Sequence, residues 1–307
     1  MLLLTVLIAV AVTAGLIAIL VARWCQRLLH GTPVTEAAAH AVAHAAGPGH
    51  ATTWWRARLH PGQATGLLLT MGAAIVVAGG VVIGILAYLV RGNDALRSID
   101  TSAADWGARH ATEDGTAVLQ RLTDLGDTRA VVVLAVVVAA VELWRAPSRF
   151  IVPFLVAVTL GNWLVTTTIK DLADRARPTL NPIAETLGPS FPSGHSSTAA
   201  AFFAAAALLL GRRRSPQVRA ILAGIAVGVA VMVAGTRVLL DVHWLSDTMA
   251  GVALGWSWFT LCAIAFGGRL LQFGAVVEEA AEEAVAPTPE AAPPRRAAPR
   301  VGRPRST

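Results

Sequence analysis

The feature that most limits how this chain can fold is a series of long stretches that carry almost no charge. A helix needs about 20 apolar residues to cross the roughly 30 Å hydrocarbon core of a bilayer. Most of the stretches reach that length, and the two shorter ones are expected to extend into their flanks. The sequence therefore predicts an all-α integral membrane protein with seven spans, at residues 1–21, 65–90, 130–143, 150–169, 196–210, 220–235 and 248–266.

The composition agrees with a chain that folds mostly in lipid. Charged residues make up 14% of the sequence, against about 25% in globular domains, which excludes an ordinary soluble enzyme and a disordered chain. We attribute the net charge of +6 to membrane orientation and contact with anionic lipid, so no nucleic-acid partner is expected. The two cysteines, Cys25 and Cys262, form neither a disulfide framework nor a recognisable metal site, and no cofactor is expected.

Basic residues are unevenly divided between the two sets of connections that alternate across the membrane. One set carries ten basic residues and one acid, Glu36, whereas the other carries nine basic and twelve acidic residues. The positive-inside rule then places the amino terminus outside and the carboxyl tail in the cytoplasm. The span at 1–21 lacks the basic n-region of a signal peptide, so we expect it to remain as an anchor in the plasma membrane.

The predicted spans divide the chain into three parts. Residues 1–64 form an N-terminal transmembrane helix and a cytoplasmic loop, residues 65–267 form a six-span core, and residues 268–307 form a disordered tail rich in Ala, Pro, Glu and Arg. Within the core, residues 93–128 are expected to form an amphipathic helix at the outer surface, with a plain loop as the alternative.

Two smaller patterns concern helix packing and metal binding. Small residues repeat as GxxxG at Gly224 and Gly228 and again at Gly251 and Gly255, which predicts close helix contacts within one bundle rather than dimerisation. The histidines of the first loop lack a regular ligand spacing, which favours a solvated loop over a metal site; they are His30, His40, His44, His50 and His60.

Three polar segments lie at the same predicted membrane face. The first runs from Lys170, the only lysine in the chain, to Pro178. Lys170 and Arg177 are seven residues apart, about two helical turns, so both cations are expected on one helix face, where they would attract an anion. Taken alone, the segment would also fit cations that extend from a helix end towards water.

The second segment, residues 191–197, opens the fifth span. Ser193 or Ser196 can cap that helix, Gly194 permits close approach of the backbone, and the free N–H groups form a site for phosphate. His195 would then lie beside the anion. The simpler interpretation is a helix cap next to an exposed histidine.

The third segment, residues 236–247, lies between the last two spans and holds Arg237, His243 and Asp247. His243 and Asp247 are four residues apart, so in a helix the carboxylate could hold the imidazole in one tautomer. An oriented imidazole can act as a nucleophile or a base. The alternative is a polar helix entrance with an ion pair.

Together the segments provide three cations and two histidines with different surroundings. A phosphate ester carries about −1.5 to −2 charge, which three cations and a helix terminus would match. His243 could attack phosphorus, His195 could protonate the leaving oxygen, and water would release phosphate from the phosphohistidine. No metal is required if the cations stabilise the phosphoryl oxygens.

These segments make the sequence resemble the type-2 phosphatidic acid phosphatase superfamily, membrane lipid phosphatases related to the vanadium haloperoxidases. The family signatures K-x6-R-P, P-S-G-H and S-R-x5-H-x3-D match residues 170–178, 192–195 and 236–247, with Thr236 in place of the serine. The resemblance covers about residues 65–266 and implies a six-helix core preceded here by one extra helix. It implies a nucleophile, its orienting partner, a general acid and a set of phosphate contacts, namely His243, Asp247, His195, and Lys170, Arg177, Ser193, Gly194 and Arg237.

We therefore expect a membrane phosphatase that removes a terminal phosphate from a lipid phosphate or pyrophosphate at the outer leaflet. The resemblance implies polyprenyl pyrophosphate, phosphatidylglycerophosphate or phosphatidic acid as the substrate, and it neither chooses among them nor indicates an oligomeric state. One alternative is a phosphotransferase that passes phosphate to a sugar or lipid hydroxyl. A non-enzymatic membrane scaffold or transporter is another.

Overall fold

The computed structural model describes residues 1–30, 64–178 and 188–270, and the regular structure in these ranges is helical, without a strand. Each predicted span corresponds to one helix of the described chain. The helices are α1 (Leu2–His30), α4 (Ala64–Leu89), α5 (Asp94–Arg109), α6 (Glu113–Thr123), the 3-10 turn η1 (Asp124–Gly126), α7 (Thr128–Arg145), α8 (Ile151–Ala173), α9 (Gly194–Leu210), α10 (Pro216–Leu239) and α11 (Leu245–Leu270).

Five helices of the described chain are long and apolar enough to cross a membrane, namely α1, α4, α8, α10 and α11. The helix α9 is apolar but has only 17 residues. The helix α7 has 18 residues and includes Arg129, Glu142 and Arg145. The protein is thus an all-helical membrane protein, and the count of seven spans stays a prediction.

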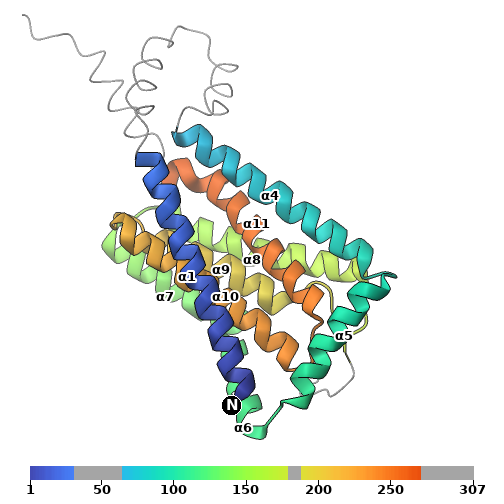
Figure 1. The fold of residues 1–307 in the computed structure, drawn as a ribbon. Coiled ribbons are helices and arrows are strands. Elements are labelled where there is room, and N and C mark those ends of the chain that lie inside the picture. Colours follow the sequence, from blue (N-terminus) through green and yellow to red (C-terminus); the bar gives the residue numbers. More distant parts are fainter. Residues whose placement is uncertain (31–63, 179–187, 271–307) are drawn as a thin grey trace, which may run out of the picture.

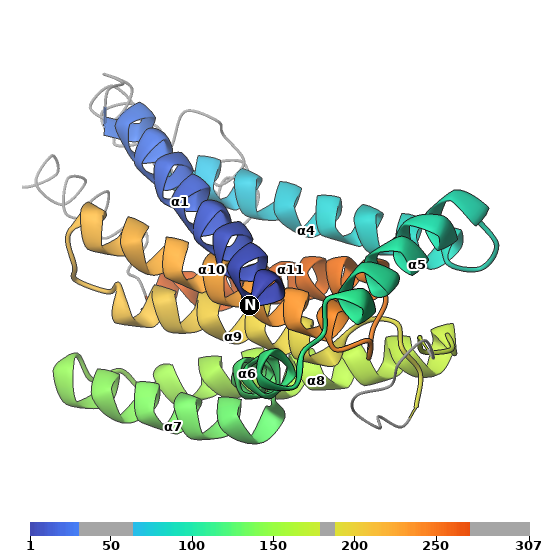
Figure 2. The same cartoon turned by 60° about the horizontal axis from the view of Figure 1, so that its bottom comes forward.

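The helices form three layers, with α9 in the middle (Figure 2). One outer layer holds α1 and α4, the middle layer holds α9, α10 and α11, and the other outer layer holds α7 and α8. Alanine makes up much of α9, so neighbouring helices approach it closely. Phe202 of α9 and, on α8, Phe154 and Val158 are among the largest buried side chains.

Both GxxxG pairs make contacts inside the bundle, as predicted. A Cβ atom on Gly251 or Gly255 would lie 2.5 or 2.2 Å from the carbonyl oxygen of Ser193 or Ser197, respectively, so α11 can approach α9 only because these residues lack side chains. Gly224 and Gly228 face α1 in the same way. The contact of Gly251 and Gly255 with α9 matters for the site, because it fixes the beginning of α9 against α11.

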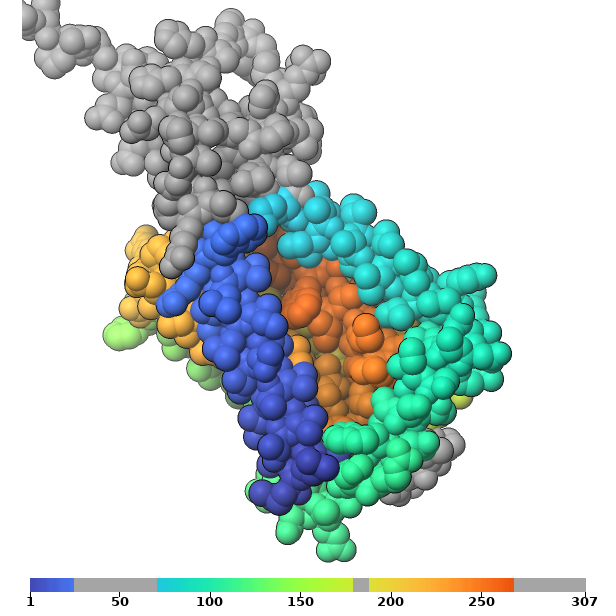
Figure 3. Space-filling model, viewed as in Figure 1, coloured from blue at the N-terminus to red at the C-terminus, as the bar shows by residue number. Residues whose placement is uncertain are grey.

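The outer helices leave a hollow on one side of the molecule. The helix α1 crosses α10, and α4 runs along α11 (Figure 1). Between α1 and α4 the surface is hollowed, and α10 and α11 form its floor (Figure 3). Apolar side chains on the outward faces are widely exposed, for example Ile17, Val77 and Leu160. Such a surface is suited to contact with lipid chains.

The expectation of one amphipathic helix over residues 93–128 is wrong, because that segment contains two helices and a 3-10 turn. The helix α5 ends at Arg109, and Thr112 adopts an extended backbone and accepts a hydrogen bond from the N–H of Gly115, which starts α6. Both helices bury one face, with Asp100 and Leu119 almost fully covered. They pack across one end of the bundle (Figure 1).

Several predicted features lie outside the described residues. These are four histidines of the first loop, His40, His44, His50 and His60, and most of the tail, from residue 271 onward. The fifth histidine, His30, is the last residue of α1.

Candidate active site

The predicted site residues lie at one end of the bundle, where four helix ends meet. Lys170 lies in the last turn of α8, Gly194 begins α9, Arg237 lies in the last turn of α10, and Asp247 lies in the first turn of α11. The three polar segments predicted from the sequence therefore come together, as expected.

The first segment is not one helix, so the argument from a shared helix face is wrong. The helix α8 ends at Ala173 because Asp174 adopts the left-handed conformation with φ 41°, which Asp tolerates better than most residues. The chain then runs extended past Arg175, whose carbonyl accepts a hydrogen bond from the N–H of Ser190. This pairing between the two ends of the α8–α9 connection turns Arg177 back towards Lys170.

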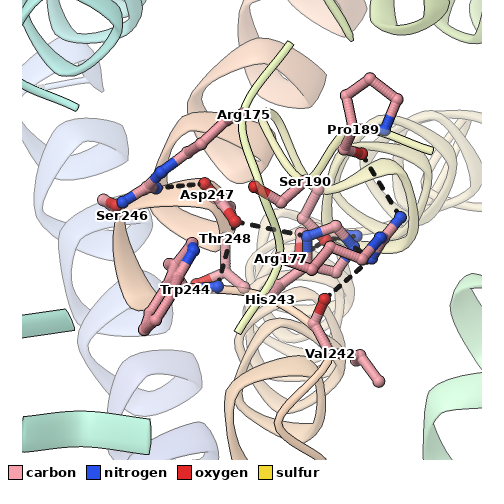
Figure 4. A network of polar contacts seen from close by, with 12 residues as sticks. Arg175, Arg177, Pro189, Ser190, Val242, His243, Trp244, Ser246, Asp247 and Thr248 are labelled. Atoms are coloured by element: carbon pink, nitrogen blue, oxygen red, sulfur yellow. Dashed lines mark hydrogen bonds and ion pairs between the residues drawn. The ribbon is translucent and has the colours of Figure 1, made fainter. Parts of the chain in front are cut away.

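Lys170 and Arg177 converge on one oxygen atom, the carbonyl oxygen of Pro189; Figure 4 shows Arg177 and Pro189. The Nζ of Lys170 donates to it at 2.7 Å and the Nη2 of Arg177 at 3.3 Å. Two cations that share one acceptor are arranged as they would need to be to share an oxygen of a phosphoryl group.

The second segment forms the predicted cap and helix start. Ser193 is the N-cap of α9 and is fully buried, and its Oγ accepts a hydrogen bond from the Oγ of Ser196 at 2.9 Å. A Cβ atom on Gly194 would lie 4.0 Å from the Cε of Lys170, so the first turn of α9 faces that cation. His195 is 29% exposed, and its Nε2 lies 4.0 Å from an oxygen of Asp127.

The third segment places His243 by a turn rather than on a helix face. Asp241 adopts the left-handed conformation with φ 54°, and the N–H of His243 then donates to the carbonyl of Arg237. The helix α11 begins only at Leu245. Asp247 reaches His243 because its Oδ2 accepts a hydrogen bond from the N–H of Trp244 at 3.0 Å and caps the helix. The predicted neighbour relation is correct, but the shared helix face is not.

The imidazole of His243 is 3% exposed and lies between an arginine and a carboxylate. The Nη1 of Arg177 lies 3.2 Å from Nε2 of His243, and Oδ2 of Asp247 lies 3.5 Å from Nδ1 (Figure 4). The second distance is longer than a good hydrogen bond, as is common for catalytic contacts without substrate. The arrangement fits a neutral imidazole with its proton on Nδ1, facing Asp247, and its lone pair on Nε2.

The pKa of His243 is lowered to about 4, because burial and the positive charges of Arg177 and Arg237 lower it by more than Asp247 raises it. Burial is the largest of these effects, because it penalises the charged imidazolium. At neutral pH the side chain is therefore uncharged, which is the form required of a nucleophile.

Arg237 forms the other side of the site. Its side chain is nearly fully buried, and its Nη1 donates to Oγ1 of Thr123 at 3.1 Å. Its Nε has no hydrogen-bond partner among the described residues. A buried guanidinium with an unused donor is costly unless it serves an anion. Electrostatic interactions link His195 to Arg237, His243 and Lys170, so all four belong to one charged cluster.

Sequence reasoning missed Arg175, which holds Asp247 in place. The guanidinium of Arg175 donates from Nη1 to Oδ1 of Asp247 and from Nη2 to Oδ2 of Asp100, the latter at 2.8 Å (Figure 4 shows Arg175 with Asp247). Asp100 also accepts hydrogen bonds from the backbone N–H and the Oγ of Ser246. The chain Asp100–Arg175–Asp247 thus connects α5 to the carboxylate beside His243.

Two signals in the sequence could have indicated this connection. Arg175 lies inside the first polar segment, two residues before Arg177. Asp100 lies among the apolar positions of the amphipathic segment, and an acid on an apolar face needs a partner. Neither signal identifies the other residue, because 75 positions separate them.

Another missed part is the wall opposite His243, which the end of α6 and the turn η1 form. Thr123 binds Arg237, and Asp127 lies beside His195. Gly126 packs beneath His195, because a Cβ atom there would lie 2.8 Å from the carbonyl oxygen of His195. The segment that the sequence assigned to the outer surface thus contributes directly to the site.

The chemistry of the site is that of an anion-binding pocket with a nucleophile. Among the described residues no group of three or more His, Cys, Asp or Glu side chains could hold a metal ion. The cations Lys170, Arg177 and Arg237 and the first turn of α9 surround a buried neutral imidazole. Such a combination defines the class of a phosphoryl-transfer site at the end of a membrane helix bundle.

Comparisons with known proteins agree with this class. Residues 150–270 match the PAP2 superfamily. The chain is 30% identical over 144 residues to phosphatidylglycerophosphatase B of Bacillus subtilis (strain 168), which covers 45% of this chain and 68% of that protein. It is also similar to the crystal structure of a transmembrane PAP2-type phosphatidylglycerolphosphate phosphatase from Bacillus subtilis, with a TM-score of 0.60 and 26% identity over 64% of this chain and 98% of that one.

The chain therefore belongs to the PAP2 superfamily, and it is a membrane phosphatase of that type. The resemblance stated from the three motifs is confirmed. The matched region, 150–270, contains all the predicted site residues.

Proposed function

We propose that the protein hydrolyses the terminal phosphate of a lipid phosphate or pyrophosphate through a phosphohistidine on His243. The observation that carries this proposal is the environment of His243. A neutral, buried imidazole has Nε2 beside Arg177 and Nδ1 facing Asp247. The cations that converge beside it would bind the phosphoryl oxygens and bring phosphorus up to Nε2.

In the first step, Nε2 of His243 attacks phosphorus and the bond from phosphorus to the leaving oxygen breaks. His195 donates a proton to that oxygen, and the Nδ1 proton of His243 remains directed at Asp247. In the second step, His195 takes a proton from water, which attacks the phosphohistidine and releases inorganic phosphate. Burial and the positive charge of Arg237 lower the pKa of His195 to about 3, whereas Asp127 raises it. Asp127 and the negative charge of the bound phosphate therefore favour the protonated form that His195 needs before the first step.

Substrate binding requires Lys170 and Arg177 to change partners. Both now donate to the carbonyl of Pro189, and Arg177 also donates to Nε2 of His243. A phosphoryl oxygen can take the place of the Pro189 carbonyl, since it accepts from both cations and carries charge. As Arg177 turns to the phosphoryl group, the lone pair of Nε2 becomes available for attack.

Among the three substrate candidates, phosphatidylglycerophosphate comes first. Its support is that both similar proteins of Bacillus subtilis carry that activity in their names. The position of the site at the end of the bundle also suits a lipid whose tails remain in the bilayer. We place the site on the extracytoplasmic side, as the charge distribution predicts.

The test is phosphate release by the purified full chain from a panel of the three lipid classes in the presence of EDTA. We expect release without added metal, and His243→Ala should reduce it by about 10³-fold or more. His110→Ala is the matched control, because His110 binds the carbonyl of Trp106, outside the site. Retained turnover in His243→Ala would remove His243 from the nucleophile role, and a new phosphoester in place of phosphate would reveal a transferase.

A further inference from the structure

A second charged cluster lies at the opposite end of the bundle from the candidate active site. The helix α9 begins at the site, and its 17 residues end at Leu210, about 25 Å away at 1.5 Å per residue. The turn that follows carries three consecutive arginines, and the end of α7 lies beside it. No part of the proposed reaction uses this cluster.

The cluster lines a pocket of about 290 Å³. Two short stretches provide its walls, one from the end of α7 and one from the α9–α10 turn. Its lining contains four guanidinium groups, one indole and no acid, from Trp144, Arg145, Ala146, Arg212, Arg213 and Arg214. The volume lies just below the range for small-molecule sites, which is about 300–1,000 Å³, so it suits a headgroup rather than a whole lipid.

One buried acid beneath the pocket compensates only part of this charge. Glu142 is 1% exposed and accepts a hydrogen bond from Nη1 of Arg145 at 2.7 Å. The Nη1 of Arg212 lies 3.8 Å from the other oxygen of Glu142. Glu142 thus pairs with two of the four arginines that line the pocket.

Arg212 is the feature that orientation in the membrane does not explain. Its side chain is 9% exposed, and its Nη1 has no hydrogen-bond partner among the described residues. Exposed arginines would satisfy the positive-inside rule equally well, without the cost of a buried, incompletely bonded guanidinium. Arg213 has φ 55°, so the chain here turns sharply and keeps three arginines at one rim.

The surroundings of the pocket fit a lipid better than a free ion. Trp144 is 86% exposed at the rim, and Val133, Val136 and Val137 are exposed along α7 below it. Tryptophan is enriched where membrane meets water. Basic pockets at the ends of membrane helices bind anionic headgroups, and arginine pairs with phosphate through two parallel hydrogen bonds.

We propose that this pocket between α7 and the α9–α10 turn binds the phosphodiester headgroup of an anionic phospholipid, whose acyl chains lie along α7. Glu142 holds Arg145 and Arg212 in place, the headgroup phosphate supplies the acceptor that Nη1 of Arg212 lacks, and Arg213 and Arg214 add positive charge at the rim.

The experiment measures the thermal unfolding midpoint of the purified full chain in neutral detergent with increasing phosphatidylglycerol. This lipid has a phosphodiester and no terminal phosphate to remove. Arg213 and Arg214 are exposed, so the double variant Arg213→Gln/Arg214→Gln should fold. We expect it to need about tenfold more phosphatidylglycerol than the wild type for the same rise in midpoint.

The matched control is Arg149→Gln/Arg219→Gln, which removes the same charge from exposed residues that do not line the pocket. It should respond within about twofold of the wild type. Both double variants should retain phosphate release from a lipid phosphate, because these residues are far from the site.

Two further arms separate the possible sources of the phosphate. Phosphatidylcholine should produce no comparable rise, whereas an equal response to it would overturn the proposal. Equal losses in both double variants would show a diffuse charge effect and would also overturn it. Inorganic phosphate is the other arm. If it raises the unfolding midpoint of the wild type but not of Arg213→Gln/Arg214→Gln, and phosphatidylglycerol raises neither, the pocket binds a free anion and the lipid proposal is wrong.

Discussion

His243 is the residue at which opposing electrostatic effects decide the chemistry. Burial and Arg177 lower its pKa, whereas Asp247 raises it, and the result is about 4. An exposed histidine has a pKa of about 6.5 and would be partly protonated in mildly acidic surroundings. The buried position therefore keeps the proposed nucleophile neutral over a wider pH range.

This lowered pKa predicts a pH dependence of stability. Between pH 6.5 and about 4 the unfolded chain binds a proton at His243 and the folded protein does not, so acid destabilises the folded protein in that window. Thermal unfolding across pH 4.5–7 should show this loss, and His243→Asn should make the loss smaller. An identical pH dependence in the two proteins would contradict the lowered pKa.

Arg175 is expected to act on catalysis by positioning Asp247. Replacing it with alanine leaves the carboxylates of Asp100 and Asp247 buried without their shared partner, which should cost about 3–5 kcal/mol of stability. The milder Arg175→Lys keeps a charge but has a single nitrogen, whereas Arg175 uses two nitrogens to reach the two acids.

For Arg175→Lys we expect kcat to fall by about 10-fold to 100-fold with little change in KM. A misoriented imidazole slows the chemical step, whereas the groups that bind the phosphate keep their positions. Steady-state kinetics on a lipid phosphate would check this. A matched control is Arg97→Lys, since Arg97 is an exposed arginine on α5. An increase in KM alone would assign Arg175 to substrate binding instead.

At the scale of elements, the site depends on the close contact between α9 and α11. Ser193 donates its backbone N–H to the carbonyl of Asp247, so the cap of one helix bonds to the first turn of the other. Gly251 and Gly255 allow this distance. The first turn of α9, which we propose binds phosphate, and the carboxylate beside the proposed nucleophile are thereby fixed to each other.

Gly255→Ala should destabilise the protein, because the new Cβ would lie 2.2 Å from the backbone oxygen of Ser197, which cannot move as a side chain would. We expect a loss of about 1–3 kcal/mol, measured as a lower unfolding midpoint in detergent. The control Gly84→Ala has no atom within 4 Å of its Cβ position and should be neutral or stabilise by up to about 1 kcal/mol. Equal midpoints would contradict the contact.

At the scale of the whole molecule, the two ends of the bundle carry different chemistry. One end holds the candidate active site, capped by α5 and α6, and the other holds the arginine pocket. The predicted orientation exposes the first end outside and the second in the cytoplasm. The predicted division of the chain makes residues 65–267 the phosphatase core, and α1, which precedes it, packs on α10.

Cysteine labelling in intact cells tests this orientation. In a chain with Cys25 and Cys262 replaced by serine, Ser102→Cys on α5 should react with a membrane-impermeant maleimide. Ser215→Cys in the α9–α10 turn should react only after permeabilisation. Both positions are exposed, so accessibility of the side chain is comparable. The reverse pattern would place the site in the cytoplasm.

The sequence by itself determined the long apolar helices, their approximate bounds, the three cations and both histidines of the candidate site. Those properties depend on local patterns, such as uncharged runs as long as a bilayer is thick and motifs of fewer than a dozen residues. It also indicated the packing of Gly251 and Gly255 within the bundle, because small residues at helical spacing let a neighbouring helix approach closely.

Only the tertiary structure decided how those residues meet. The left-handed residues Asp174 and Asp241 end α8 and α10 early and turn Arg177 and His243 into the site, which helical spacing could not reveal. The link from Asp100 through Arg175 to Asp247 joins positions more than 70 residues apart. Such a contact leaves no local pattern, because its energy exists only when two distant segments are packed together.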